Sequence, residues 1–225
     1  AISQSLVLEA LQLHNIKSPW TVFEDFGGPL STLQGALRAV GTGTVSINGS
    51  EAELVVSDPS TKAHLCYGES GYFAISAAGL CVFEARVKMP TALSDAGSNY
   101  HVNIGLQGSA STDDAPFALG GMGFYYNHSV NSGNWVCYTS NSSTPDTDNS
   151  SVAAVADTYT TFKITVASGT VSYYIDGVLV ASSTNVPVDD PDNLMRMLTG
   201  IRADAALATG STLIVDYLYL EIFGE

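Results

Sequence analysis

The sequence predicts an all-β protein built as a sandwich of two antiparallel sheets, and three observations support this prediction. Short runs rich in β-branched and aromatic residues recur along most of the chain, separated by clusters of Gly, Asn, Asp and Ser. The segment VSYYIDGVLVASS places Asp176-Gly177 between two alternating runs, a strong signal for a hairpin with a type I′ turn. No repeat of fixed period is present, so the pattern does not favour a solenoid or a propeller.

The length and composition of the chain are typical of one domain. Its 225 residues are 45% hydrophobic and 13% charged, which is enough apolar material for a sizeable core. We therefore expect one β-sandwich over residues 21–225, preceded by a short arm at residues 1–20.

Each expected strand is a short run bounded by turn residues. In the first half of the chain the runs are 22–26, 44–47, 52–57, 63–66, 72–75, 81–89 and 100–107. In the second half they are 122–127, 135–139, 160–167, 171–175, 178–182, 197–202 and 213–223. Residues 138–157 are instead rich in Ser, Thr, Asn and Asp and lack apolar periodicity before Val152, which predicts an exposed loop.

The arm carries apolar residues for which a sandwich has no obvious place. Leu6, Ala10 and Leu13 are at helical spacing, although the alternation of Leu6, Leu8 and Ala10 also fits a strand. We expect assembly, either as an oligomer or on a larger particle, to bury this surface. The residues of the arm expected to be buried by assembly are Leu6, Leu8, Leu11, Leu13 and Ile16.

The charge of the chain argues against two classes of partner. The formal net charge is −14, from 22 acids and 8 bases, and no Lys or Arg lies between Lys88 and Lys163. A nucleic-acid-binding protein needs a basic surface for the phosphates, so nucleic acid is not an expected partner. The same deficit, with no apolar run near the roughly 20 residues that span a bilayer, argues against a membrane.

Three cysteines are present, and they lack the close spacing of a metal site or a redox pair. We expect Cys66, Cys81 and Cys137 to be reduced and mostly buried. A bond between Cys66 and Cys81 is the alternative, if their Cα atoms come close enough.

Three segments resemble the concanavalin A-like lectin and glucanase superfamily. Residues 79–90, GLCVFEARVKMP, are similar to a strand of that superfamily, the hairpin FKITVASGTVSYYIDGVLV resembles its penultimate strands, and IVDYLYLEIF resembles its closing strand. The resemblance implies a curved two-sheet jelly roll whose concave face can hold a carbohydrate. Lectins, glycosidases and structural domains share this shape, so the fold alone does not decide the function.

The resemblance also implies where catalytic acids would stand in an enzyme. Glucanases of the superfamily carry Glu-x-Asp-x-x-Glu on the strand after the segment that resembles 79–90, because retaining hydrolysis needs two carboxyl groups about 5 Å apart. The corresponding strand here is NYHVNIGLQG, residues 99–108, which has no carboxylate. We therefore expect the protein not to be an enzyme.

The same strand supplies candidate glycan-binding residues. His101, Asn103 and Gln107 alternate and share one face, where polar groups suit a sugar. A structural, hydrogen-bonded polar stripe is the alternative. Aromatic rings that stack on a pyranose could come from the next two strands, with alternation burying about half of them. These aromatic candidates are Tyr125, Tyr126, Trp135 and Tyr138.

One metal site follows from the resemblance. Superfamily members often hold a structural calcium near the first and last strands, which implies Glu24, Asp25 and Asp216 as ligands here. No motif indicates any other cofactor.

An acidic sandwich without catalytic acids, preceded by an apolar arm, also resembles the decoration, head-fibre and tail-adhesion proteins of tailed bacteriophages. This resemblance implies a structural or attachment protein of a virion, assembled in the host cytoplasm as an oligomer or with other virion proteins, with a surface glycan as a further candidate partner. The alternatives are a secreted carbohydrate-binding lectin module and a glucanase-type hydrolase.

Overall fold

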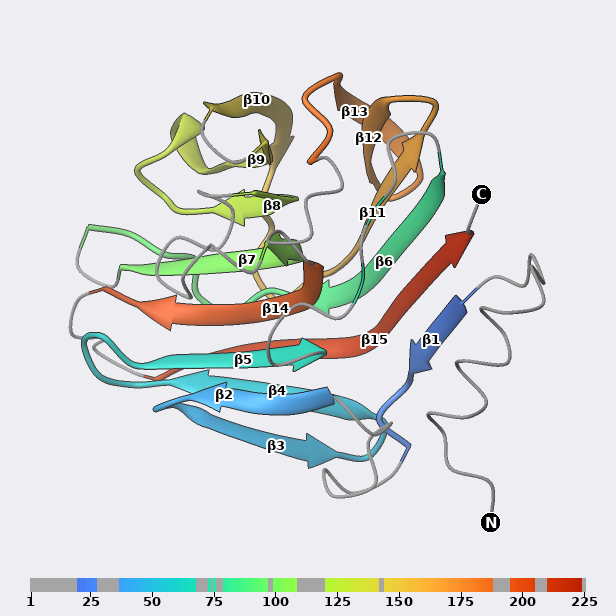
Figure 1. The fold of residues 1–225 in the computed structure, drawn as a ribbon. Coiled ribbons are helices and arrows are strands. Elements are labelled where there is room, and N and C mark those ends of the chain that lie inside the picture. Colours follow the sequence, from blue (N-terminus) through green and yellow to red (C-terminus); the bar gives the residue numbers. More distant parts are fainter. Residues whose placement is uncertain are drawn as a thin grey trace, which may run out of the picture.

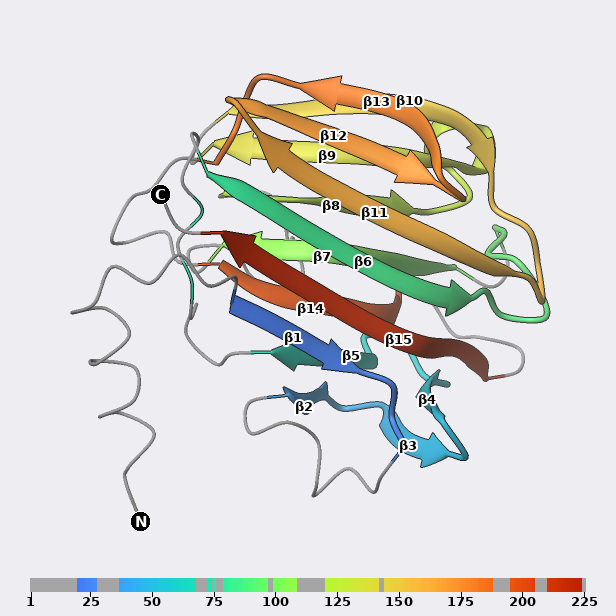
Figure 2. The same ribbon diagram turned by 90° about the vertical axis from the view of Figure 1, so that its right-hand side faces the viewer.

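The protein is described by a computed structural model. It describes residues 20–27, 37–67, 73, 75, 79–96, 99–108, 120–141, 144–187, 195–204 and 210–223. Two antiparallel sheets form most of this part and pack face to face (Figures 1 and 2), as the sequence predicts. The predicted arm lies outside the described residues, apart from the backbone of Trp20.

The eight-stranded sheet has the order β13-β12-β11-β6-β15-β4-β3, and β1 also pairs with β15. Its strands are β1 Trp20–Glu24, β3 Thr44–Asn48, β4 Glu51–Val56, β6 Leu80–Lys88, β11 Tyr159–Ala167, β12 Thr170–Ile175, β13 Val178–Ser183 and β15 Ser211–Phe223. The seven-stranded sheet has the order β10-β9-β8-β7-β14-β5-β2. Its strands are β2 Leu37–Gly41, β5 Lys62–Tyr67, β7 Tyr100–Gly108, β8 Gly121–Tyr126, β9 Asn134–Asn141, β10 Thr144–Ala153 and β14 Met195–Ala203.

The hairpin of β12 and β13 shows how a local sequence signal sets the register. Asp176 and Gly177 have φ angles of 49° and 79°, as a type I′ turn requires at its two central positions. The Asp176 carboxylate also accepts a hydrogen bond from the backbone N–H of Thr161, 2.8 Å away, which ties the turn to β11. The predicted hairpin is therefore confirmed.

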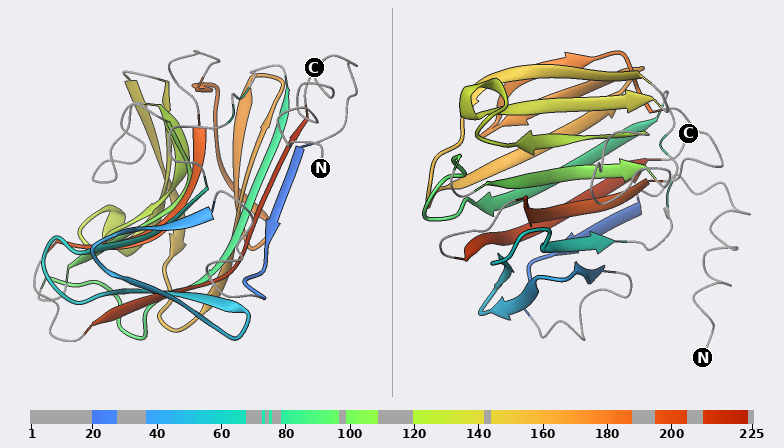
Figure 3. Two further views of the ribbon diagram at one scale, coloured as in Figure 1. Left: turned by 60° about the horizontal axis from the view of Figure 1, so that its bottom comes forward. Right: turned by 90° about the vertical axis from the view of Figure 1, so that its left-hand side faces the viewer.

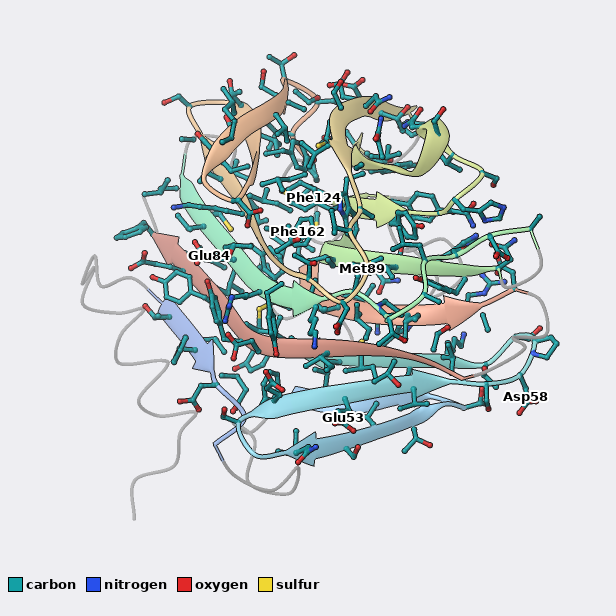
Figure 4. All side chains as sticks on the ribbon, turned by 180° about the vertical axis from the view of Figure 1, so that it is seen from behind. Glu53, Asp58, Glu84, Met89, Phe124 and Phe162 are labelled. Atoms are coloured by element: carbon teal, nitrogen blue, oxygen red, sulfur yellow. The ribbon has the colours of Figure 1, made fainter. Side chains whose placement is uncertain are left out.

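Alternating side chains of both sheets meet between them and form one core. In β6 the burial alternates strictly, with Phe83, Ala85 and Val87 inaccessible to solvent. Aromatic rings from both sheets meet at the centre (Figure 4), where the ring of Phe162 lies 4.9 Å from that of Phe124 and 4.5 Å from that of Trp135. Such edge and tilted contacts stabilise the packing beyond the area they bury.

The prediction of a loop over residues 138–157 is wrong. Strand β9 continues to Asn141, and β10 then pairs antiparallel with it from Thr144 to Asn149. Most side chains of β10 are exposed, because it is the edge strand of its sheet, so its sequence needs no apolar alternation. Charged residues on such an edge also discourage pairing with another chain.

Two further predictions need correction. Strand β2 was not expected; it pairs with β5 from Leu37 to Gly41. In the predicted strand at 72–75, the described residues show an isolated bridge between Phe73 and Met195, with no longer ladder. The other predicted strands are present, with their ends displaced by at most two residues.

The cysteine prediction is confirmed. Cys66, Cys81 and Cys137 are all free and buried. Cys66 lies in β5 of the seven-stranded sheet and Cys81 in β6 of the eight-stranded sheet, so the alternative bond between them is not formed. Within the described residues, no helix has the length and apolar character needed to cross a membrane.

Candidate functional site

Strand β7 divides its side chains between the core and the outer face of the seven-stranded sheet. Val102, Ile104 and Leu106 belong to the core, so the intervening positions face the opposite way. The predicted trio of His101, Asn103 and Gln107 lies on this outer face. Figure 3 shows the sheet as a curved surface.

The strand register places glycines between the polar residues of the outer face. Asn103 is flanked by Tyr125 of β8 and Gly200 of β14. The next outward position of β7 is Gly105, which pairs with Gly123. A methyl group on Gly105 would approach the carbonyl oxygen of Met122 to 2.3 Å, so this position has no room for a side chain. Strands β7 and β8 therefore contribute no side chain at this paired position.

Gln107 lies at one end of this glycine pair, beside Arg196. Its side-chain oxygen accepts a hydrogen bond of 2.9 Å from Nε of Arg196. An arginine only donates, so this contact fixes the orientation of the amide and leaves Nε2 of Gln107 as a donor. Nε2 of Gln107 and Oδ1 of Asn103 are both buried and have no hydrogen-bond partner.

A buried polar atom without a partner is rare and costly, about 1–3 kcal/mol for each group. Here a donor and an acceptor occur on the same face of one strand, four residues apart, although Asn103 and Gln107 are only 2% and 0% exposed. At a rise of about 3.4 Å per residue their Cα atoms are separated by roughly 13 Å. This face therefore holds two buried hydrogen-bonding groups without a partner, which a ligand could reach only if the atoms that cover them give way.

The other end of the face contains charged groups. Nε2 of His101 lies 2.5 Å from Oδ2 of Asp204, and Nε of Arg202 lies 3.3 Å from the other oxygen of that carboxylate. Burial lowers the pKa of His101, and the attraction of Asp204 only partly opposes this effect. The ring of Tyr125 meets the His101 ring edge-on, with centroids 5.2 Å apart. Burial and the nearby Asp204 raise the pKa of Tyr125 to about 12, so its hydroxyl stays protonated.

The four aromatic candidates divide between two environments. Tyr125 and Tyr138 lie on the outer face and are half-buried. Tyr126 and Trp135 are 1% exposed and belong to the core, with their rings 5.5 Å apart. The suggestion that these two bind a glycan is therefore wrong. Alternation along β8 and β9 buries half of the set, as expected.

The sequence interpretation missed several residues of the site. Strand β14 places Arg196, Leu198, Gly200 and Arg202 on the outer face, and its two arginines, near the ends of the strand, alternate with buried core residues. His64 of β5 gave no such signal, because four consecutive positions of that strand are buried. It pairs with Gly200, where an added methyl carbon would come within 1.9 Å of the His64 ring.

The suggested calcium ligands have other partners. Glu24 accepts a hydrogen bond from the backbone of Phe26, and Asp25 accepts one from the backbone of Gly27. Asp216, the extra residue of a bulge in β15, forms an ion pair of 2.5 Å with Arg86. In the part of the chain that the structure describes, no three metal-ligating side chains gather. The calcium site stays a prediction.

The assembly residues of the arm lie outside the described part of the chain. These residues are Leu6, Leu8, Leu11, Leu13 and Ile16. An oligomer and a place in a virion stay predictions.

Comparison with known proteins agrees with the fold. A family model described as the concanavalin A-like lectin/glucanases superfamily matches residues 83–210, more than half of the chain. No curated protein sequence matches the chain.

Solved structures resemble the chain at low identity. The endo-1,3-beta-glucanase from Streptomyces sioyaensis has a TM-score of 0.63 at 13% identity, covering 92% of this chain and 97% of its own. A protein of unknown function from Shewanella oneidensis has a TM-score of 0.61 at 16% identity, covering 99% and 95%. The beta-glucanase of Bacillus licheniformis has a TM-score of 0.59 at 11% identity, covering 91% and 98%. At these identities the likeness shows the fold alone.

Proposed function

Because the chain belongs to the concanavalin A-like lectin/glucanases superfamily, we propose that the outer face of its seven-stranded sheet binds a carbohydrate without cleaving it. The observation that carries this proposal is the pair of buried, unpartnered groups on β7, Oδ1 of Asn103 and Nε2 of Gln107. A sugar hydroxyl both donates and accepts, so one ligand with several hydroxyls can satisfy both groups.

The surroundings of the two amides suit a sugar. Tyr125 pairs with Asn103, and Tyr138 pairs with Gly123, which itself pairs with Gly105 of β7. A tyrosine ring offers an apolar face to the C–H groups of a pyranose, while its hydroxyl keeps a polar partner. Because the amides are shielded from water, hydrogen bonds to a ligand are stronger there than on an open surface.

The charges of the face support binding without hydrolysis. Strands β5, β7, β8, β9 and β14 contain no Asp or Glu. The carboxylate of Asp204, just beyond β14, is held by His101 and Arg202. Two carboxyl groups at the spacing of a glycosidase are not found among these residues, whereas two of the similar structures carry names of glucanases. Attachment to a polysaccharide surface requires only binding.

The proposal is tested with a glycan array, followed by calorimetric titration of the best ligand and an assay for released sugar ends. We expect binding and no release. Tyr138→Ala removes one stacking surface, worth about 0.5–1.5 kcal/mol, so its affinity should fall roughly 2- to 10-fold. The matched control is Tyr174→Ala, on the outer face of the eight-stranded sheet, which should bind as tightly as the natural protein.

Three outcomes would contradict the proposal. If no glycan binds, or if Tyr138→Ala and Tyr174→Ala behave alike, then this face is not the site. Release of sugar ends by the natural protein would show that it is an enzyme, and would contradict binding without cleavage.

A further inference from the structure

The two sheets of this acidic chain carry similar numbers of bases, four in the seven-stranded and three in the eight-stranded sheet, and differ mainly in their acids. The sequence has 8 Lys and Arg against 22 Asp and Glu. Four of the eight bases belong to strands of the seven-stranded sheet, in which β10 is the only strand with acids. The four bases are Arg38, Lys62, Arg196 and Arg202.

The outer face of the eight-stranded sheet has a different charge pattern. Strands β4, β6 and β15 contribute acids there, with Glu53 and Glu84 visible in Figure 4. Arg86 on this face is occupied by Asp216, and Lys88 by Asp157 at 2.6 Å. The two outer faces of the sandwich therefore differ in charge.

The register distributes the cations along the candidate site. Arg196 pairs with Gln107 at one end of the face, and Arg202 pairs with His101 at the other. Lys62 pairs with Arg202 from the next strand. The two arginines are six positions apart in β14, roughly 20 Å at the rise of a strand. Asp204 offsets part of the charge at the second end.

We propose that the carbohydrate bound on this face is an acidic polysaccharide, with carboxylate or sulfate groups on its sugar units that lie beside Arg196, Arg202 and Lys62. This inference rests on the proposed function and names its ligand class. Cations spaced along the face match a polymer with repeated charges better than a single small anion. Arginine is also well suited to carboxylate and sulfate, because its planar fork donates two parallel hydrogen bonds.

The overall negative charge does not prevent this binding at physiological salt. Two packed sheets lie about 10 Å apart, and the Debye length is about 8 Å at an ionic strength of 0.15 M. Acids on the far face are therefore largely screened from a ligand on the near face. The local charges of β5, β7 and β14 decide which ligand is attracted.

The test compares each acidic polymer with its neutral form in calorimetric titrations at 0.15 M salt. Polygalacturonate and polymannuronate are paired with the same samples after methyl esterification, and dextran sulfate, which has no carboxylates, is paired with neutral dextran. We expect at least one acidic polymer to bind ten times more tightly than its neutral form, and higher salt to weaken binding. Uronates and sulfated glycans serve as separate arms, so the result identifies the anionic group.

Charge-neutral variants locate the contact. Arg196→Gln should weaken binding of the acidic polymer at least tenfold, and Arg202→Gln provides a second test if the first variant folds poorly. Lys163→Gln is the matched control, since it removes the same charge from β11 of the other sheet and should leave the affinity unchanged.

Each negative outcome has a distinct meaning. Equal binding of acidic and neutral forms would overturn the acidic ligand and leave the proposed function standing. No binding to any glycan would overturn both. A single-stranded oligonucleotide that binds as tightly as the glycan would show general attraction of polyanions, and would also overturn the inference.

Discussion

Replacing Asn103 by Leu tests whether its unpartnered oxygen is kept for a ligand. The two side chains have the same number and branching of heavy atoms, so the change removes the polar atoms with little change of shape. The buried Oδ1 has no hydrogen-bond donor in the folded protein. Removing such an atom relieves a desolvation cost of about 1–3 kcal/mol. We expect Asn103→Leu to raise the free energy of unfolding by about 1–2 kcal/mol and to lower glycan affinity at least tenfold.

Thr199→Val is the matched control. Oγ1 of Thr199 is also buried without a partner, but Thr199 pairs with the core residue Ile104 and so faces away from the site. This substitution should give a similar gain in stability with unchanged glycan affinity. Urea unfolding followed by circular dichroism, with calorimetric titration, measures both quantities. If Asn103→Leu lowers the free energy of unfolding by more than about 1 kcal/mol and Thr199→Val does not, the reasoning is refuted. Such a loss would mean that the folded protein itself provides a hydrogen-bond donor for Oδ1 of Asn103.

Three further predictions follow from buried and crowded groups. Tyr159 and Tyr217 each donate a hydrogen bond to a glutamate, and burial, followed by this bond, raises the pKa of both hydroxyls to about 12. Their contribution to stability should therefore be complete below pH 10 and be lost between about pH 10 and 12. Urea unfolding measured at a series of alkaline pH values tests this. Gly200→Ala would bring a methyl carbon against the ring of His64 and should cost about 1–3 kcal/mol in urea unfolding, with no loss contradicting the packing. Burial raises the pKa of Cys81 to about 12, so a thiolate-specific reagent at pH 8 should modify it only after unfolding.

Local signals predicted the fold well where sequence and tertiary structure agree. The turn at Asp176-Gly177 specifies its hairpin through two positive φ angles, which few residues adopt. Strand β6 alternates apolar and polar residues and has one buried and one outer face. In such elements the sequence pattern and the tertiary environment impose the same structure.

Edge strands were harder to predict, for a physical reason. Strand β10 is held by backbone pairing with β9 and exposes most of its side chains. Polar residues such as Ser, Thr, Asn and Asp are therefore tolerated along it. The intrinsic propensities of its residues favour a loop, and the segment is a strand because its backbone pairs with β9. Among the described strands, β2 is likewise at an edge, with β5 as its one partner.

The candidate site could be predicted only in part. Alternation in β7 correctly placed His101, Asn103 and Gln107 on one face, but it could not tell which of Tyr125 and Tyr126 shares that face. That choice depends on the register between β7 and β8, which is a property of the assembled sheet. The lack of partners for the two amides likewise depends on every neighbour in three dimensions.

The most direct test of the central claim follows the side-chain amide signals of this face by nuclear magnetic resonance during addition of an acidic oligosaccharide. The amide of Asn48, which donates to Glu53 at 2.9 Å on the other sheet, is the internal control. We predict that the NH₂ signals of Gln107 and Asn103 shift as the ligand saturates and that those of Asn48 stay fixed. Saturation of binding without any shift of the Gln107 and Asn103 signals would contradict the account.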